Sequence, residues 1–299
     1  MNNRRPQKPM RGKDDKRSRR PIRDRAERAP YSSREREASN RGAGREVDDT
    51  PALVGRHPIL EALRSGRGIT RIWIQEGLKE GSLREIAALA HERHIAFSEV
   101  PKQFLDRLAQ GVPHQGVGAR VALKPTLGLE DLPKLLASSP LPLLYILDGI
   151  QDPHNLGAIL RTADATGATG VVIPERGASG LTAVVAKASA GAIEYVPVVR
   201  VTNVAQAIDK IKEAGVFVFA ADPGAPRLYT EVDWTGPSAV VIGGEGSGVR
   251  PLVQSRSDGL VRLPMLGKIS SLNASNAASV IGFEAIRQRM RQSSVLTRI

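Results

Sequence analysis

Hydrophobic positions recur with two different periods along the second half of the chain. Residues 143–147, LLYIL, are apolar without a break, which is typical of a strand buried on both faces. Similar runs alternate with segments whose apolar residues return every three or four positions, as on one face of a helix. The predicted strands cover 143–147, 170–174, 194–201, 216–222, 238–244 and 259–265, and the predicted helices cover 155–166, 183–190, 203–215 and 273–290. This alternation predicts an α/β domain with a mostly parallel sheet and helices on both faces.

A smaller region of alternating elements precedes this domain. Residues 69–75 read as a strand, with Ile72 and Ile74 on one face and Trp73 on the polar face. A helix ending at Gly66 comes before it. The remaining elements are predicted helices at 82–94 and 102–109 and predicted strands at 95–100 and 117–123. We expect a small α/β domain in 51–123, a linker with a short helix in 124–140, and the large domain in 141–299.

Residues 1–50 differ from the rest of the chain in composition. They hold 16 Lys or Arg against nine Asp or Glu, so they contribute +7 of the net charge of +12. They nearly lack large apolar residues and cannot bury enough surface to offset the entropy lost on ordering, which predicts a disordered basic arm. The arginine excess favours an electrostatic tether for RNA phosphates; the alternative is a solvated tail that aids solubility.

Residue types that are missing exclude several classes of protein. The chain has no cysteine, which excludes disulfides, thiolate nucleophiles and Cys-based zinc sites and fits a reducing compartment. It has neither an apolar run of about 18 residues for a membrane span nor the apolar core of a secretory signal. Its five histidines form no metal-binding motif, so we expect no metal. These features predict a cytoplasmic protein without a membrane contact, and the positive charge points to nucleic acid.

Three loops at the carboxyl ends of predicted strands hold most of the candidate chemistry, because parallel sheets bind ligands there. The first, LDGIQDPHNLGAILRTADATG, leads into a helix that carries Asn155 and Arg161. The second, VVIGGEGSGV, sets Glu245 among glycines, which allow a ligand close to the backbone. The third runs from LPMLGK through SSLN into a long helix with small residues in its first turns.

Each loop also has a purely structural interpretation. Asn155 alone predicts a helix cap, and Arg161, six residues later, a surface charge; the functional alternative is that both border one cleft. The glycine-rich loop lacks the spacing of a dinucleotide fingerprint and the Lys-Ser/Thr of a P-loop, so a tight turn is the simpler explanation, which Glu245 weakens. The small residues of the last helix suit tight packing on the protein or on a second subunit.

Taken together and in this order, the three loops resemble the SpoU family of RNA ribose methyltransferases. The matching stretches are DGIQDPHNLGAILRTA, IGGEGSGV and LPMLGKISSLNAS, within about 141–291. Residues 53–122, with GRHPILEAL and HQGVGARV, are similar to the L30e-like substrate-binding domain that precedes the catalytic domain in ribosomal-RNA members. The resemblance implies a SPOUT-type α/β knot, in which the C-terminal segment threads through a loop to build the cofactor site. It also implies a homodimer whose active site uses both subunits.

The resemblance further implies a reaction and a set of residues. A methyl group passes from S-adenosyl-L-methionine to a ribose 2′-hydroxyl. The site residues that it implies are Asn155, Arg161, Glu245, Ser271 and Asn273, and the implied cofactor contacts are Gly243, Leu263, Met265 and Leu272. Arg161 is the family's suspected proton acceptor. A guanidinium with a pKa above ~12 is a poor base, so clamping a nearby phosphate is an equally physical role.

By this resemblance the substrate is a guanosine in large-subunit (23S) ribosomal RNA, because transfer-RNA members lack a separate L30e-like domain. A transfer-RNA 2′-O-ribose methyltransferase is the alternative within the family. A non-catalytic RNA-binding factor for ribosome assembly is a second alternative, which the intact Asn155, Arg161 and Glu245 disfavour. A nucleotide-dependent oxidoreductase would need a glycine fingerprint that the sequence lacks.

Overall fold

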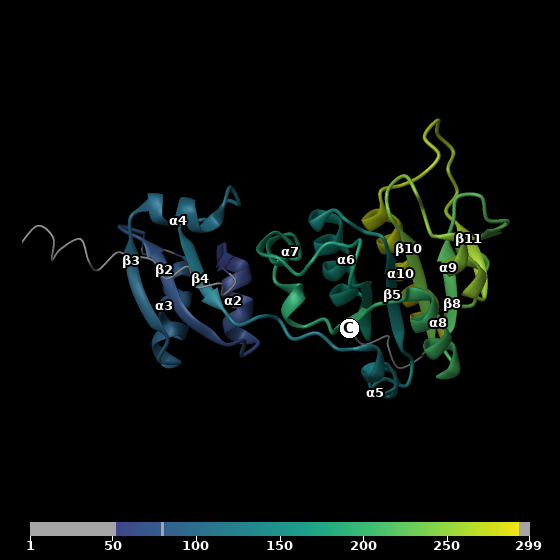
Figure 1. The fold of residues 1–299 in the computed structure, drawn as a ribbon, viewed down its shortest axis with the longest axis horizontal. Helices are drawn as coiled ribbons and strands as arrows, with labels where there is room; N and C mark the ends of the chain where they lie inside the picture. The colour runs from purple at the N-terminus through teal and green to yellow at the C-terminus, as the bar shows by residue number, and fades with distance from the viewer. Residues whose placement is uncertain (1–51, 79–80, 293–299) are drawn as a thin grey trace, which may run out of the picture. The chain divides into compact units, whose positions relative to one another are not determined.

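The structure is a computed structural model that describes residues 52–78 and 81–292. The arm predicted in residues 1–50 lies outside the described residues. Two sheets organise the described chain, and Figure 1 shows them with their helices. The smaller sheet has four strands in the order β1-β4-β2-β3, and the larger has seven in the order β7-β6-β5-β10-β8-β11-β9.

The small domain is an α/β unit, as predicted. Its elements are β1 (Ala52–Val54), α2 (Arg56–Arg64), β2 (Ile69–Gln75), α3 (Ser82–Glu92), β3 (Ala96–Val100), α4 (Lys102–Ala109) and β4 (Val117–Val121). The sequence prediction missed β1, because a strand of three residues is too short to show a period. Trp73 is buried rather than on a polar face, because α4 covers that side of β2; its ring lies 5.2 Å from that of Phe104, between centroids.

The large domain alternates strands and helices. Its elements are β5 (Leu143–Asp148), α6 (Pro153–Ala165), β6 (Gly170–Pro174), α7 (Ala183–Ala188), η2 (Ala192–Glu194), β7 (Val198–Val201), α8 (Val204–Glu213), β8 (Phe217–Ala221), β9 (Arg227–Leu228), η3 (Tyr229–Glu231), β10 (Ser238–Gly243), α9 (Pro251–Arg256), β11 (Gly259–Arg262) and α10 (Ala274–Gln292). Neighbouring strands pair in parallel, which confirms the predicted fold class. The sequence prediction missed β9 and α9, which are short, and began β7 too early, where η2 and a turn precede it.

Alternate residues of each strand face opposite layers of helices. Leu143, Tyr145 and Leu147 belong to the core that α6 and α10 cover, whereas Leu144 and Ile146 belong to the core beneath α5 and α8. This double burial explains why β5 is apolar at every position before its last residue. The expected linker contributes to the second core through η1 (Leu129–Asp131) and α5 (Leu132–Ala137).

The C-terminal segment returns to the middle of the large sheet. After β11, residues 263–273 run past the loop that follows β10, and the two loops line one cavity. α10 then packs against α6 and β10. This course brings the last loop and the glycine-rich loop together at one cavity, and the C-terminal knot that the resemblance implies stays a prediction. Among the described helices, none combines the length and apolar character needed to cross a lipid bilayer.

Candidate active site

A cavity of about 560 Å³ opens where β8, β10 and β11 end. Its walls come from the glycine-rich loop, the end of β11 with its following loop, and the start of α10. The predicted residues that line it are Gly243, Glu245, Leu263, Met265, Ser271, Leu272 and Asn273. All four predicted cofactor contacts are therefore gathered around one cavity, although their role stays a prediction.

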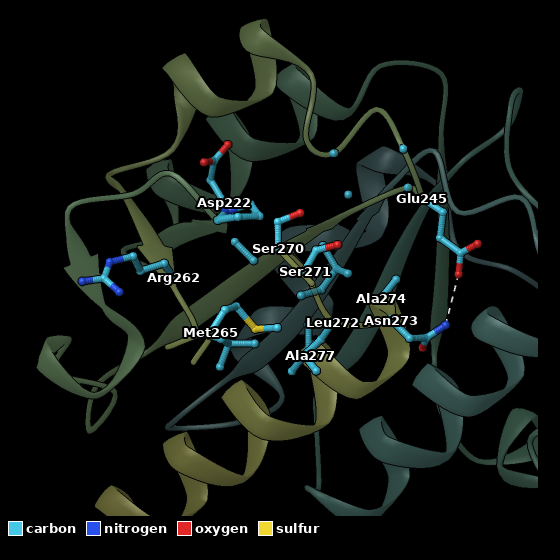
Figure 2. Close-up of a pocket in the computed structure, with 18 of the residues that line it drawn as sticks. Asp222, Glu245, Arg262, Met265, Ser270, Ser271, Leu272, Asn273, Ala274 and Ala277 are labelled. Atoms are coloured by element: carbon cyan, nitrogen blue, oxygen red, sulfur yellow. Dashed lines mark hydrogen bonds between the residues drawn. The ribbon is translucent and has the colours of Figure 1, made fainter. Parts of the chain in front are cut away.

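Three polar side chains from distant segments meet at the edge of this cavity. Asn155 donates from Nδ2 to Oε1 of Glu245 at 2.7 Å. Asn273 donates from Nδ2 to the same Oε1 at 3.1 Å and to Oδ1 of Asn155 at 2.9 Å. Figure 2 shows Glu245 and Asn273 turned toward one another, joined by the hydrogen bond. The cluster links α6, the glycine-rich loop and α10 at one point.

The structure contradicts the interpretation of Asn155 as a helix cap. Pro153 occupies the first turn of α6, where a residue without an N–H is tolerated, so the helix begins before Asn155. Asp152 is the cap and accepts the N–H of His154 at 2.9 Å. The side chain of Asn155 is thereby free to reach Glu245. Asn273 caps α10 instead, because its Oδ1 accepts the N–H of Ser275 at 2.9 Å.

The glycine-rich loop folds back on itself at positions where only glycine fits. A Cβ atom on Gly243 would collide with the backbone of Gly248, and one on Gly244 would collide with the carbonyl oxygen of Gly149. Gly248 donates its N–H to the carbonyl of Gly244 at 3.0 Å, which closes the turn. Close packing of backbone on backbone therefore explains Gly243 and Gly244, whereas Gly246 and Gly248 have the positive φ angles, +82° and +63°, that favour glycine.

Arg161 lies apart from this cluster. Six helical residues turn the chain through about 600°, which leaves Arg161 about 120° around the axis from Asn155. Its side chain is exposed, does not line the cavity, and has no hydrogen-bond partner in the described chain. The structure of one chain therefore does not bring Arg161 and Asn155 to the same cleft, the functional alternative predicted for them.

Two functional candidates escaped the sequence prediction. The carboxylate of Asp148, buried at the end of β5, accepts hydrogen bonds from Nε of Arg250 at 2.8 Å and Nη2 at 2.6 Å. An acidic residue that directly follows a wholly apolar strand was the available signal, since a buried charge needs a partner.

Among residues 52–78 and 81–292, no group of three or more His, Asp or Glu side chains is placed to hold a metal ion.

Family comparisons agree with both domains. Residues 142–283 match the model of the SpoU rRNA Methylase family. Residues 52–127 match the model for RNA 2′-O ribose methyltransferase substrate binding. YacO of Bacillus subtilis, which bears a TrmH family tRNA/rRNA methyltransferase name, is 44% identical over 79% of this chain and 95% of its own length. The chain belongs to the SpoU family of RNA 2′-O-methyltransferases.

Other relatives of this SpoU methyltransferase extend the same result. A TrmH family relative from Staphylococcus aureus is 45% identical over 81% of this chain and 98% of its own length. A solved RNA 2′-O ribose methyltransferase has a TM-score of 0.67 and 27% identity, covering 80% of this chain and 88% of its own. The SpoU methyltransferase AviRb of Streptomyces viridochromogenes, solved with the cofactor AdoMet, has a TM-score of 0.68 and 26% identity, covering 80% and 90%.

S-adenosylmethionine is the cofactor of this SpoU methyltransferase. The cavity suits it chemically, because backbone N–H and C=O groups of a glycine loop lie beside apolar side chains. Figure 2 shows Met265 and Leu272 on the same side of this cavity. Leu272 is 42% exposed, so apolar surface is left for a ligand to cover.

Proposed function

We propose that this SpoU methyltransferase methylates the 2′-hydroxyl of a ribose, that of a guanosine, in large-subunit (23S) ribosomal RNA. The observation that carries the proposal is the separate small domain, matched as a substrate-binding domain, in front of the catalytic domain. Transfer RNA is the competing substrate, since the names of the relatives mention both RNAs. We also propose the cytoplasm as its compartment, in keeping with a chain that has no cysteine.

The cavity residues divide into two proposed roles. Gly243, Leu263, Met265 and Leu272 hold the cofactor, which when bound supplies an electrophilic methyl group. Glu245 directs the nucleotide: Asn155 and Asn273 both donate to its Oε1, so Oε2 is available to accept from a ribose hydroxyl. Ser271 offers a further hydroxyl on the cavity wall. Holding the reacting groups in line in this way contributes rate by orientation.

We assign Arg161 to a phosphate of the substrate. Its guanidinium is exposed and without a hydrogen-bond partner among the described residues, so it is available to an incoming anion. A planar guanidinium binds two phosphate oxygens at once, whereas it releases a proton too reluctantly to act as a base. In the homodimer that the resemblance implies, whose active site uses both subunits, Arg161 of the partner subunit holds this phosphate beside the ribose, and the phosphate is also able to take up the proton that the attacking hydroxyl loses.

RNA has a second proposed contact on the small domain. A cavity of about 900 Å³ there is lined by the start of α2, the start of α4 and the loop before β4, with Arg56, His57 and Lys102 among its residues. Arg56 donates from its backbone N and from Nε to Gln115, both at 3.0 Å, which ties α2 to that loop. Basic side chains gathered in one cleft, with Arg56 held by the loop, suit the phosphates of a bound strand.

We further propose that the enzyme is a homodimer. One side of α10 exposes apolar side chains, with Phe283 51% exposed and Val280 and Met290 beside it at helical spacing. An apolar stripe of this kind on a helix is typical of a face that another protein surface covers. Sedimentation of wild type and of Phe283→Glu tests the proposal: we expect a dimer and a monomer, and a monomeric wild type would contradict it.

Transfer of labelled methyl from S-adenosyl-L-methionine to unmodified 23S ribosomal RNA, with transfer RNA in parallel, tests the proposed substrate. We expect label in ribose of the ribosomal RNA alone. Label in transfer RNA alone would overturn the substrate while leaving the family assignment intact.

Arg161→Ala is expected to bind the cofactor normally and to lose methyl transfer, and normal turnover of this variant would remove Arg161 from the reaction.

A further inference from the structure

One buried residue contacts both ends of the glycine-rich loop. Asp148 is 1% exposed and ends β5. Its backbone carbonyl accepts the N–H of Gly244 at 2.9 Å, where the loop begins. Its carboxylate accepts the backbone N–H of Arg250 at 2.8 Å, where the loop ends. The loop that carries Glu245 is therefore fixed at its start and at its end to the same residue.

The side chain of Arg250 completes this attachment. Its Nε and Nη2 both donate to Oδ1 of Asp148, while its backbone N–H donates to Oδ2. The arginine side chain is 61% exposed and the aspartate side chain is 0% exposed, so the guanidinium covers a carboxylate that water does not reach. Because a buried carboxylate without partners is costly, this geometry holds the end of the loop in place.

We infer that Asp148 is a positioning residue for methyl transfer, which together with Arg250 clasps the glycine-rich loop and so sets the position of Glu245 and of the cavity wall. Neither residue lines the cavity, so each acts through the loop. The inference rests on the proposed roles of the cavity and of Glu245. A displacement of about 1 Å at a reacting group lowers rate by about 100-fold, so a loosened loop has a measurable consequence.

Two variants remove different parts of the clasp. Arg250→Ala removes the guanidinium and keeps the backbone N–H. Asp148→Asn replaces one accepting oxygen with an NH₂ group, which then faces an N–H or guanidinium donor of Arg250. We expect both to raise the Kd for S-adenosylmethionine, measured by calorimetry, and to lower kcat/KM for methyl transfer by about 100-fold. Arg250→Lys, which keeps a cation near Oδ1, is expected to recover part of the loss.

The chain provides a matched control at the far end of α9, the helix whose N-cap is Arg250. Arg256 of α9 pairs with Asp209 of α8 at 3.0 Å, and both side chains are largely exposed. Arg256→Ala therefore breaks an Asp–Arg pair without touching the glycine-rich loop, and its cofactor Kd and kcat/KM are expected to match wild type. Equal losses in Arg256→Ala and Arg250→Ala, or wild-type Kd and kcat/KM in Arg250→Ala, would overturn the inference.

Two further outcomes are separated by the design. If Asp148→Asn does not fold, Arg250→Ala and Arg250→Lys still decide the question, because the side chain that they change is exposed. If wild type transfers methyl to neither RNA, the proposed substrate fails, while the cofactor Kd of the variants still tests the clasp.

Discussion

Glu245 receives hydrogen bonds from Asn155 and Asn273, so one carboxylate oxygen joins two segments that lie far from it in sequence. The donors occupy Oε1, and the second oxygen is the one proposed to meet the ribose. At the scale of a residue, the site therefore depends on a carboxylate that is held in place by amides rather than by a cation.

Glu245→Gln separates the two roles of this side chain, which are to accept the hydrogen bonds that fix it in place and to accept one from the ribose hydroxyl. The amide oxygen still accepts from Asn155 and Asn273, but the second oxygen becomes an NH₂ group that does not accept from a hydroxyl. We expect kcat/KM to fall about 10- to 100-fold, consistent with loss of about 1.5–3 kcal/mol from a hydrogen bond to a charged group, with an unchanged melting temperature. Steady-state methyl transfer checks this, with Glu213→Gln at the exposed end of α8 as the control. A fully active Glu245→Gln would show that the charge has no role.

At the scale of an element, α10 lies against β5 and α6. A Cβ on Gly282 would collide with Oη of Tyr145, so this glycine permits the close approach. The Tyr145 hydroxyl and Oγ1 of Thr166 are 3.2 Å apart, and Ser279 of α10 is 2.7 Å from Thr162 of α6, between hydroxyl oxygens. α10 is thus held against α6 by one part-buried hydrogen bond as well as by apolar packing, at a seam that also contains the Tyr145–Thr166 pair of β5 and α6.

Gly282→Ala tests this close approach. Alanine normally favours a helix over glycine by about 1 kcal/mol, yet here we expect destabilisation by about 1–3 kcal/mol because the methyl group overpacks the seam. Thermal unfolding measures it, and adding Tyr145→Phe, which removes the colliding oxygen, is expected to restore part of the stability. Gly236→Ala, where a Cβ meets nothing within 4 Å, is the control. A neutral Gly282→Ala would mean that the helix shifts freely.

The buried Tyr145 of β5 also makes the stability of the large domain depend on pH. Burial raises the pKa of Tyr145 from 10.0 to about 12. The contribution of the neutral hydroxyl to the free energy of unfolding is therefore complete below pH 10. It is lost as pH rises from 10 toward 12, because over this interval Tyr145 ionises in the unfolded chain before it ionises in the folded one. We expect the stability advantage of wild type over Tyr145→Phe to shrink across that interval in denaturant unfolding. A constant difference from pH 8 to 11.5 would contradict the assignment.

At the scale of the whole molecule, charge is distributed unevenly. Residues 1–50, which lie outside the described residues, carry +7 of the net +12. Deleting them is expected to weaken RNA affinity at low salt and to reduce its salt dependence, because fewer phosphate counterions are released. Cofactor affinity is expected to stay unchanged. RNA titrations at several salt concentrations check this, with an arm of equal length whose arginines are replaced by glutamine. Unchanged RNA affinity at every salt concentration would exclude the electrostatic tether and favour the alternative, a solvated tail that aids solubility.

The sequence by itself determined the class of fold, the two α/β regions and the family. Strands buried on both faces have to be apolar throughout, as 143–147 are, and helices have to repeat their apolar positions every three or four residues. The candidate chemistry of the three loops was also visible in the sequence, because a glycine-rich turn and its glutamate are neighbours along the chain. Short elements such as β1 and β9 escaped, because two or three residues carry no period.

Only the tertiary structure decided which side chains meet. Asn155 lies 90 residues from Glu245 and 118 from Asn273, and Asp148 lies 102 residues from Arg250. Such contacts depend on which strands become neighbours and on the path of the last segment, which local periodicity does not encode. Because α6 begins at Pro153, Asn155 lies within the helix, and the helix phase places Arg161 about 120° around the axis from it. Periodicity and motifs therefore identify the elements, while strand order and helix phase assemble the site.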